Sequence, residues 1–245
     1  MLLSTGLKKD DSNGAVKIDG TNQYANGYDV QIAKKVAEGL GKKPLIVKTS
    51  WNGLIPALTS GKIDMIIAGM SPTAERKKEV AFSNSYYTSE PVMLVRKDGN
   101  YANASSLDDF KDAKVTSQQG STSTRSSPNS RVQNKKLQWE TFAQMRQALE
   151  SGVIDAYVSE RPEALTAESA NSKFKMIQFK KGFEVGEEDA TIAIGMKKGD
   201  ARLDQVNAAL AKISSEDQVK LMDDMIKKQP ASSDASDDEQ TFFSQ

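Results

Sequence analysis

The sequence predicts an α/β protein built from two lobes whose sheets are mostly parallel. Helical and strand-like patterns alternate from residue 29 onward, which is typical of βαβ units. One eight-residue pattern, spanning a helix end, a glycine and the start of a strand, occurs twice. The length of 245 residues suits two small lobes better than one compact domain.

The first of these elements is an amphipathic helix that begins with Asp29 as N-cap and ends at Gly39 or Gly41. Its apolar face consists of Val30, Ala33, Ala37 and Leu40. The segments that follow alternate between strand, helix and strand, over residues 45–48, 52–60 and 63–68. This order predicts a parallel βαβ unit.

The repeated pattern predicts that the two lobes are related. Ala57–Asp64 and Ala148–Asp155 share Ala-Leu, Ser-Gly and Ile-Asp at matching positions, and mostly apolar residues follow each copy. The alternative is a common helix-to-strand turn that arose twice. Ligands of open α/β sheets bind beyond the carboxyl ends of strands. We therefore expect the residues that end the two repeated strands, Gly69 and Glu160, to border a shared cleft.

Two β-like runs, residues 90–96 and 190–196, flank the second copy and predict two crossings between the lobes, which form a hinge. The expected division is lobe one over residues 1–89 and 193–229, and lobe two over residues 90–192. Residues 230–245 are polar and acidic, which predicts a linker or tail.

Composition excludes several classes of function. Lysine plus arginine and aspartate plus glutamate both number 33, so no net field attracts nucleic acid or an anionic membrane. The absence of histidine and cysteine removes imidazole bases, thiol nucleophiles and the usual zinc ligands. We expect no cofactor, no metal and no catalytic residue. No segment approaches the roughly 18 apolar residues of a membrane span, and the N-terminus lacks a signal peptide's apolar core.

A candidate carboxylate site follows the first repeated strand, over Ser71–Arg76. Ser71 is a good helix N-cap, Pro72 suits the first helical position, and backbone N–H groups are unpaired at such an end. Arg76 adds a planar fork that matches a carboxylate. The alternative is an ordinary capped helix with a surface arginine.

Two further residues complete a candidate amino-acid site. Glu160, at the end of the second repeated strand, supplies a carboxylate for an ammonium group. Its alternative role is a solvated ion pair with Arg161. Trp51 starts the helix before the first repeated strand, so its ring either covers a ligand side chain or packs in the core. A cation site facing an anion site recognises a zwitterion.

An ordered series of motifs carries a family resemblance. The motifs are Gly27-Tyr28-Asp29, Trp51 to Ile67, Ser71 to Arg76, Ala81-Phe82-Ser83, Tyr86-Tyr87 and Gly152 to Ala156. Together they resemble the family-3 extracellular solute-binding proteins. The resemblance implies a type II periplasmic-binding-protein fold, a free polar α-amino acid as ligand, and an ABC permease as partner. It also implies a location in the periplasm or at the extracellular face of the cytoplasmic membrane.

The resemblance also implies roles for particular residues. Trp51 matches the aromatic wall, Gly69 and Ser71 match hydrogen-bonding positions, and Arg76 matches the carboxylate fork. Glu160 matches the ammonium partner, where the family more often has aspartate. Gly120, Ser121 and Thr122 align with the small residue and hydroxyl that hold the carboxylate from lobe two.

Two departures from the family pattern suggest reading-frame disturbances. The family's opening strand and its Tyr-Ala-Pro-Phe-like loop are missing, and codons for Tyr-Ala-Pro-Phe-Asn-Trp read one base later give Met-Leu-Leu-Ser-Thr-Gly. From Ser121 to about Glu140 apolar periodicity disappears, and codons for Val-Tyr-Leu-Tyr read out of frame give Ser-Thr-Ser-Thr. The alternative for the second segment is a naturally polar loop.

Rival functions remain at this point. Dehydratases that act on small carboxylates share the fold, and Glu160 would then be the acid or base. A ligand-sensing receptor module is a third interpretation. The acidic tail, ending in Thr241-Phe242-Phe243, resembles linkers that join such domains to their own permease. A tether of this kind raises effective concentration at the permease.

Overall fold

The computed structural model describes residues 4–7, 14–121, 139–179, 183, 186–228 and 240–243. The chain divides into two compact units. Unit 1 draws on Met1–Thr88, Glu187–Gln229 and Glu239–Gln245, and the described part of unit 2 lies within Ser89–Gly186. The chain therefore leaves unit 1 after Thr88 and returns to it at Glu187.

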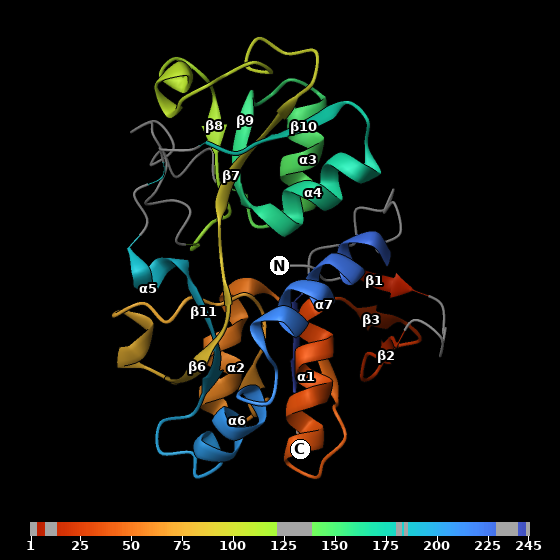
Figure 1. The fold of residues 1–245 in the computed structure, drawn as a ribbon, viewed down its shortest axis with the longest axis vertical. Helices are drawn as coiled ribbons and strands as arrows, with labels where there is room; N and C mark the ends of the chain where they lie inside the picture. Colours follow the sequence, from red (N-terminus) through yellow and green to blue (C-terminus); the bar gives the residue numbers. More distant parts are fainter. Residues whose placement is uncertain are drawn as a thin grey trace. The chain divides into compact units, whose positions relative to one another are not determined.

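Unit 1 contains two sheets. The smaller has the order β1-β3-β2, with β1 Ser4–Leu7, β2 Val16–Lys17 and β3 Tyr24–Asn26. The larger has the order β4-β12-β5-β11-β6, formed by β4 Ile46–Thr49, β5 Met65–Ile66, β6 Ala81–Thr88, β11 Thr191–Met196 and β12 Gln240–Phe243. The described N-terminal residues, Ser4–Leu7, thus form a strand of the smaller sheet and not of the larger one (Figure 1).

Helices cover both faces of the larger sheet. Its helices are α1 Tyr28–Gly39, α2 Leu54–Ser60, α5 Glu187–Ala190, α6 Leu203–Leu210 and α7 Ser215–Lys228, with short 3-10 turns η1 Trp51–Gly53 and η2 Arg76–Lys78. Successive strand side chains point to opposite faces. Accordingly Met65 packs in the cluster that contains the apolar face of α1, whereas Ile66 packs in the cluster that contains α2. The predicted amphipathic helix is confirmed as α1, which ends at Gly39. Its N-cap, however, is Gly27 and not Asp29, because the helix already begins at Tyr28 and Asp29 lies in its first turn.

Strand β12 was not expected from the sequence, which predicted a linker or tail over residues 230–245. Gln240–Phe243 instead pairs with two strands at once, antiparallel to β4 over four residues and antiparallel to β5 over two. The remainder of the predicted tail, residues 230–239 and 244–245, lies outside the described residues. The four residues Gln-Thr-Phe-Phe do not alternate between polar and apolar side chains, so no strand periodicity is visible there in the sequence.

Unit 2 contains one sheet of order β10-β7-β9-β8. Its elements are β7 Pro91–Arg96, η3 Leu107–Phe110, β8 Val115–Thr116, α3 Phe142–Glu150, β9 Ala156–Glu160, α4 Arg161–Ala170 and β10 Phe174–Ile177. Strand β7 is buried on both faces, because Val92 and Leu94 pack in one cluster while Met93 and Val95 pack in another. The apolar run from residue 90 to 96 therefore forms a central strand.

The two copies of the repeated pattern have the same local structure. Each is a helix followed by a glycine in the left-handed region and then a strand, with φ of 82° at Gly61 and 77° at Gly152. The aspartate of each copy pairs with an arginine, Asp64 with Arg202 at 3.0 Å and Asp155 with Arg96 at 3.5 Å. These matching features agree with the prediction of helix, glycine cap and buried strand in both copies.

The sheet of unit 2 is mixed and the two sheets of unit 1 are antiparallel, whereas the sequence predicted mostly parallel sheets. Neighbouring strands in the larger sheet of unit 1 all run antiparallel, and β8 with β9 is the parallel pair of the unit 2 sheet. Strands β4 and β5 do run parallel to each other, as a βαβ unit requires, but β12 lies between them. Strand β11 returns from the other unit and β12 from the chain end, and both run opposite to β4 and β5.

The left-handed glycine at the end of α2 generates a stability prediction. Replacing Gly61 with alanine is expected to lower the free energy of unfolding by about 1 kcal/mol, because a Cβ disfavours this backbone region. The new Cβ would also lie 2.9 Å from Lys197 Nζ. Urea unfolding of the variant and the parent chain measures this change. Gly186→Ala, where a Cβ meets nothing within 4 Å, serves as control; equal losses in the two variants would contradict the prediction.

Candidate functional site

The candidate residues of unit 1 follow the carboxyl ends of two parallel strands. Trp51 lies two residues after the end of β4, and Gly69 and Ser71 follow β5 by a few residues. Parallel strands bring their carboxyl ends to the same edge of a sheet, where ligands of α/β proteins bind. The structure therefore places Trp51, Gly69 and Ser71 at one edge, as the sequence analysis expected.

Arg76 is held by two contacts within this edge. Its Nη1 donates a hydrogen bond of 2.9 Å to the backbone oxygen of Ser71, and its guanidinium carbon lies 5.3 Å from the centre of the Trp51 ring. Stacking of this kind suits the flat, weakly hydrated guanidinium and would not suit lysine. The two contacts fix the plane of the fork, which is the condition for two-point recognition of a carboxylate.

The predicted helix beginning at Pro72 is wrong, because this segment forms only the short turn η2. Ser71 is buried, and its hydroxyl donates to the backbone oxygen of Asp189 at 2.8 Å instead of capping a helix. Thr73 takes the capping role, since its Oγ1 accepts from the N–H of Arg76 at 3.3 Å. Only the short turn η2 follows before β6 begins at Ala81, so the segment is too short to form a regular helix.

Of the two roles that the sequence left open for Trp51, the structure shows packing against the core, together with a contact to Arg76. Its ring is partly buried and packs against the cluster of α2 and β5 that includes Leu54, Leu58 and Ile66. The same ring lies under the guanidinium of Arg76. Trp51 therefore joins the core of unit 1 to its candidate carboxylate fork.

Gly69 is positioned by a buried hydrogen-bond chain that sequence reasoning missed. The Gly69 N–H donates to the Tyr86 hydroxyl at 3.2 Å, and this hydroxyl donates to Asp29 Oδ1 at 2.8 Å. The Tyr28 hydroxyl donates to the Tyr86 backbone oxygen at 2.8 Å. Gly69 adopts φ of 62°, which favours glycine. Gly69 was predicted to hydrogen-bond a ligand. In this structure its N–H group instead donates to the Tyr86 hydroxyl.

Burial is the main cause of the shifted pKa values of the two tyrosines in this hydrogen-bond chain. It raises the pKa of the Tyr86 hydroxyl well above its usual value, and the nearby Asp29 carboxylate raises that pKa further. Burial and Asp29 likewise raise the pKa of Tyr28. Both tyrosines therefore stay neutral donors, which keeps the loop at Gly69 in one geometry.

In unit 2, Glu160 stands where the sequence predicted it, at the end of β9. Its Cα pairs with Pro91 of β7, and the residue also precedes the first turn of α4. Its side chain is partly buried and makes no capping hydrogen bond to that helix. The backbone N–H of Arg161 donates to the oxygen of Glu90 at 3.0 Å, which fixes the corner where strand becomes helix.

A buried carboxylate beside Glu160 holds this corner in place. Glu163 accepts hydrogen bonds from the hydroxyls of Ser159 and Tyr157, and it pairs with Arg146 at 2.9 Å. Burial raises the pKa of Tyr157 well above its usual value, and Glu163 adds to this effect. The network ties β9, α3 and α4 together. Its sequence signal was the Ser159-Glu160-Arg161-Pro162-Glu163 run, in which a strand end meets a proline-started helix.

The remaining predicted residues of unit 2 follow β8. Gly120 adopts φ of 72°, and the Ser121 hydroxyl donates to the backbone oxygen of Gln118 at 2.8 Å. Thr122 lies outside the described residues, as does most of the segment whose lost periodicity suggested a shifted reading frame. The structure therefore places Gly120 and Ser121 together in a tight turn.

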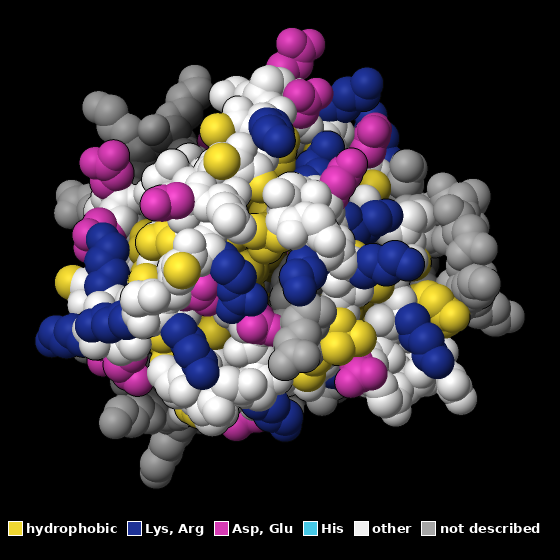
Figure 2. Space-filling model, turned by 90° about the horizontal axis from the view of Figure 1, so that it is seen from below, with side chains coloured by type: hydrophobic (Ala, Val, Ile, Leu, Met, Phe, Trp, Pro, Cys, Tyr) yellow, Lys and Arg dark blue, Asp and Glu magenta, His cyan; other side chains and the backbone are white. Residues whose placement is uncertain are grey.

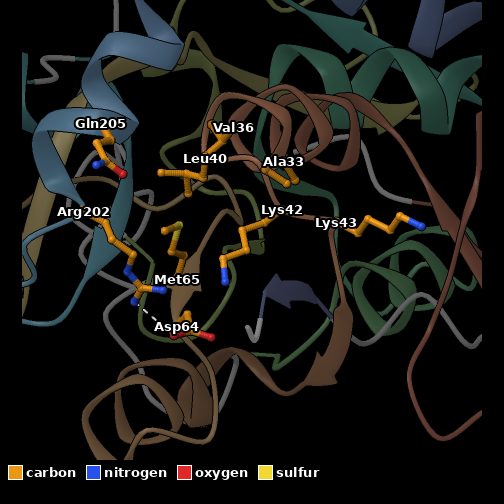
Figure 3. Close-up of a pocket in the computed structure, with 10 residues that line it drawn as sticks. Ala33, Val36, Leu40, Lys42, Lys43, Asp64, Met65, Arg202 and Gln205 are labelled. Atoms are coloured by element: carbon orange, nitrogen blue, oxygen red, sulfur yellow. Dashed lines mark hydrogen bonds and ion pairs between the residues drawn. The ribbon is translucent and has the colours of Figure 1, made fainter.

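A separate cavity of about 390 Å³ lies in unit 1 at the opposite end of the strands (Figure 3). Its lining consists of Ala33, Val36, Ala37, Leu40, Lys42, Lys43, Asp64, Met65, Arg202 and Gln205. Lys43 precedes β4 and Asp64 precedes β5, so the cavity adjoins the amino ends of these strands. It is therefore distinct from the edge that carries Trp51 and Ser71.

The surface shows no concentration of one charge sign over the face drawn in Figure 2, where basic, acidic and apolar side chains lie interspersed. This distribution accords with the balance of 33 basic and 33 acidic residues. No helix among the described residues is long and apolar enough to span a membrane.

Comparison with known proteins identifies the family. The family model for bacterial extracellular solute-binding proteins, family 3, matches residues 11–225. The chain belongs to this family. Its members have the type II periplasmic-binding-protein fold, which the two α/β units of this chain share.

Two curated relatives from Bacillus subtilis (strain 168) illustrate the similarity. The ABC transporter glutamine-binding protein GlnH is 30% identical over 92% of this chain and 81% of its own length. The arginine-binding extracellular protein ArtP is 32% identical over 75% of this chain and 71% of its own length.

Solved structures agree with the sequence comparison. The substrate-binding protein of an amino acid ABC transporter matches with a TM-score of 0.68 and 32% identity, covering 86% of this chain and 92% of that one. An ancestral arginine-binding protein bound to glutamine matches with a TM-score of 0.67 and 32% identity, covering 90% and 93%. AbpA from Streptococcus pneumoniae, bound to L-arginine, has a TM-score of 0.70 at 27% identity, covering 87% and 88%.

The buried chain at Gly69 generates a second prediction. Tyr86→Phe removes a hydroxyl that accepts from Gly69 and donates to Asp29, so we expect a loss of about 1–3 kcal/mol in the free energy of unfolding. Faster hydrogen exchange at the Gly69 amide is expected as well. Denaturant unfolding and exchange measured by NMR test both effects. Tyr24→Phe, the same change at a partly buried tyrosine of unit 1, is the control, and a Gly69 amide that exchanges at the parent rate would contradict the assignment.

The raised pKa values of buried tyrosines predict how the protein responds to alkali. Tyr28, Tyr86 and Tyr157 have folded-state pKa values above the unfolded value of about 10, so stability is fully present below that pH and falls above it. An absorbance titration at the tyrosinate band is expected to show these three of the six tyrosines ionising only as the chain unfolds. Smooth ionisation of all six while circular dichroism stays native would contradict this.

Proposed function

We propose that this protein binds a free polar α-amino acid and delivers it to an ABC permease for uptake. The observation that carries the proposal is the fixed guanidinium of Arg76, held against Ser71 and Trp51 at the carboxyl ends of β4 and β5. The family membership and the named relatives support the same ligand class.

In this proposal Arg76 binds the α-carboxylate of the ligand. A charge-assisted, two-point bond to a carboxylate is stronger and more directional than a neutral hydrogen bond. The contact with Trp51 holds the guanidinium before the ligand arrives, so little side-chain entropy is lost on binding. Ser71 contributes through its backbone, because its hydroxyl is engaged with Asp189 and its oxygen orients Arg76.

Glu160 is the proposed partner of the ligand's ammonium group. Glu160 ends β9, and the buried network of Glu163, Tyr157 and Arg146 ties this strand to the helices α3 and α4 beside it. Gly120, Ser121 and Thr122 are the proposed second contact to the ligand carboxylate, and Gly69 is a further proposed contact. Recognition of both charged groups favours a free amino acid over a peptide, because a peptide lacks one of the two charges at each residue.

The proposed ligand and the proposed cellular location rest on the similarity to the named relatives. Glutamine and arginine are the first candidates, since the named relatives and structures bind them. We propose a location at the extracellular face of the cytoplasmic membrane or in the periplasm, contact with the membrane only through the permease, and fusion to that permease through the acidic tail. Binding without catalysis is part of the proposal.

Calorimetric titration of the purified chain against the twenty amino acids tests this function. We expect one polar amino acid to bind and Arg76→Ala to weaken it at least about 30-fold, because truncating one partner of a desolvated charge pair costs about 2–5 kcal/mol. Glu160→Gln is expected to weaken binding to a smaller extent, since the amide still accepts one hydrogen bond.

Matched controls separate ligand contact from general loss of charge. Lys78→Ala removes an exposed cation two residues from Arg76, and Glu140→Gln removes an exposed carboxylate of unit 2. Both are expected to bind like the parent. A chain that binds none of the twenty amino acids, or an Arg76→Ala variant that binds as the parent does, would refute the proposal. Turnover of a carboxylate substrate that is lost in Glu160→Gln would point to an enzyme instead.

A further inference from the structure

Strand β12 occupies an unusual place in unit 1, between two strands that are consecutive in the βαβ unit. Phe242 pairs with Val47 of β4 on one side and with Ile66 of β5 on the other. The pair of strands and the segment between them thus have the geometry of β-augmentation, in which an extended segment adds its backbone hydrogen bonds to existing strands.

Strand β4 depends on this segment for its place in the sheet. Within the described part of the chain, its other strand-like pairing is the isolated bridge between Ile46 and Ile18. Ile46 and Ile66 are fully buried, so unpaired backbone groups beside them would lack both partners and water. Gln240–Phe243 is therefore the link that joins β4 to β5 and to the rest of the sheet.

Both flanking strands lead directly into the proposed amino-acid site. Trp51 follows β4 and Ser71 follows β5, and Arg76 bridges the two segments by its bond to Ser71 and its contact with the Trp51 ring. A change in the spacing of β4 and β5 would move Trp51 away from Arg76. Contact between the two residues thus requires that the space between the strands be filled.

We infer that the space between β4 and β5 is a strand-binding groove, and that its resident occupant, Gln240–Phe243, positions Trp51 against Arg76 for amino-acid binding. The inference rests on the proposed function for its effect on affinity. The occupant contributes through backbone pairing with both strands, which any extended segment can make.

A disulfide tests the occupant directly, since the chain has no cysteine. Lys48 and Thr241 are opposite partners across β4 and β12, and such pairs have the Cα separation that a disulfide needs. We expect the double variant Lys48→Cys, Thr241→Cys to form an intramolecular bond on mild oxidation. The control pair Asn84→Cys, Thr241→Cys joins β12 to β6, three strands away in the sheet, and is expected not to form one. No disulfide, or a disulfide-linked dimer, would overturn the assignment of the resident segment.

A proline tests the effect on the amino-acid site. Phe242→Pro removes a backbone N–H in the middle of the sheet and is expected to weaken amino-acid binding at least tenfold. Phe242→Ile keeps the N–H and is expected to bind within threefold of the parent. A synthetic peptide of residues 238–245, added in excess to the Phe242→Pro variant, is expected to restore part of the lost affinity. Parent-like affinity in Phe242→Pro would overturn the inference.

The two proposals fail separately. If the parent chain binds no amino acid, the proposed function is wrong, while disulfide formation still tests the groove. If the parent chain and the oxidised Lys48→Cys, Thr241→Cys variant bind the amino acid equally well, the result supports the inference, because the site then forms while Gln240–Phe243 is held in the groove. The Phe242→Pro variant could lose binding because the groove is empty or because the protein unfolds. The peptide of residues 238–245 separates these two causes, since it can restore binding only in a folded protein whose groove it fills.

Discussion

The buried backbone of β4 and β5 sets the constraint on which unit 1 depends. Ile46 and Ile66 are fully buried, and a strand there must find hydrogen-bond partners within the protein. The segment that satisfies both strands comes from the far end of the chain and runs antiparallel to each. Because the two strands carry Trp51 and Ser71 at their carboxyl ends, the same pairing determines where the proposed ligand contacts lie.

Each unit also fixes its candidate residues through one buried polar network. In unit 1 the Tyr86 hydroxyl joins Asp29 to the loop at Gly69, and in unit 2 Glu163 joins Ser159 and Tyr157 to Arg146. Buried polar groups are costly when unpaired and rigid when fully paired. A binding site that must present charges in fixed positions benefits from this rigidity, since less order has to be gained when the ligand binds.

Arg76 shows how a short, irregular segment replaces the helix that the sequence suggested. A capped helix would have offered a carboxylate several backbone N–H groups. The structure instead uses a threonine cap, a backbone acceptor at Ser71 and the face of Trp51 to orient one guanidinium. The proposed chemistry is therefore preserved by different means, with the arginine as the principal anion contact of unit 1.

The sequence by itself determined the α/β class, helix α1, the two repeated helix, glycine and strand segments, and the strand that ends at Glu160. These features depend on periodicity and on glycines at positive φ, which act over a few neighbouring residues. Only the tertiary structure decided the mixed strand directions, the capping by Thr73, the tyrosine chain at Gly69 and the place of Gln240–Phe243 in the sheet. Each of these joins residues far apart in sequence or competes with a local preference, so no local pattern could specify it.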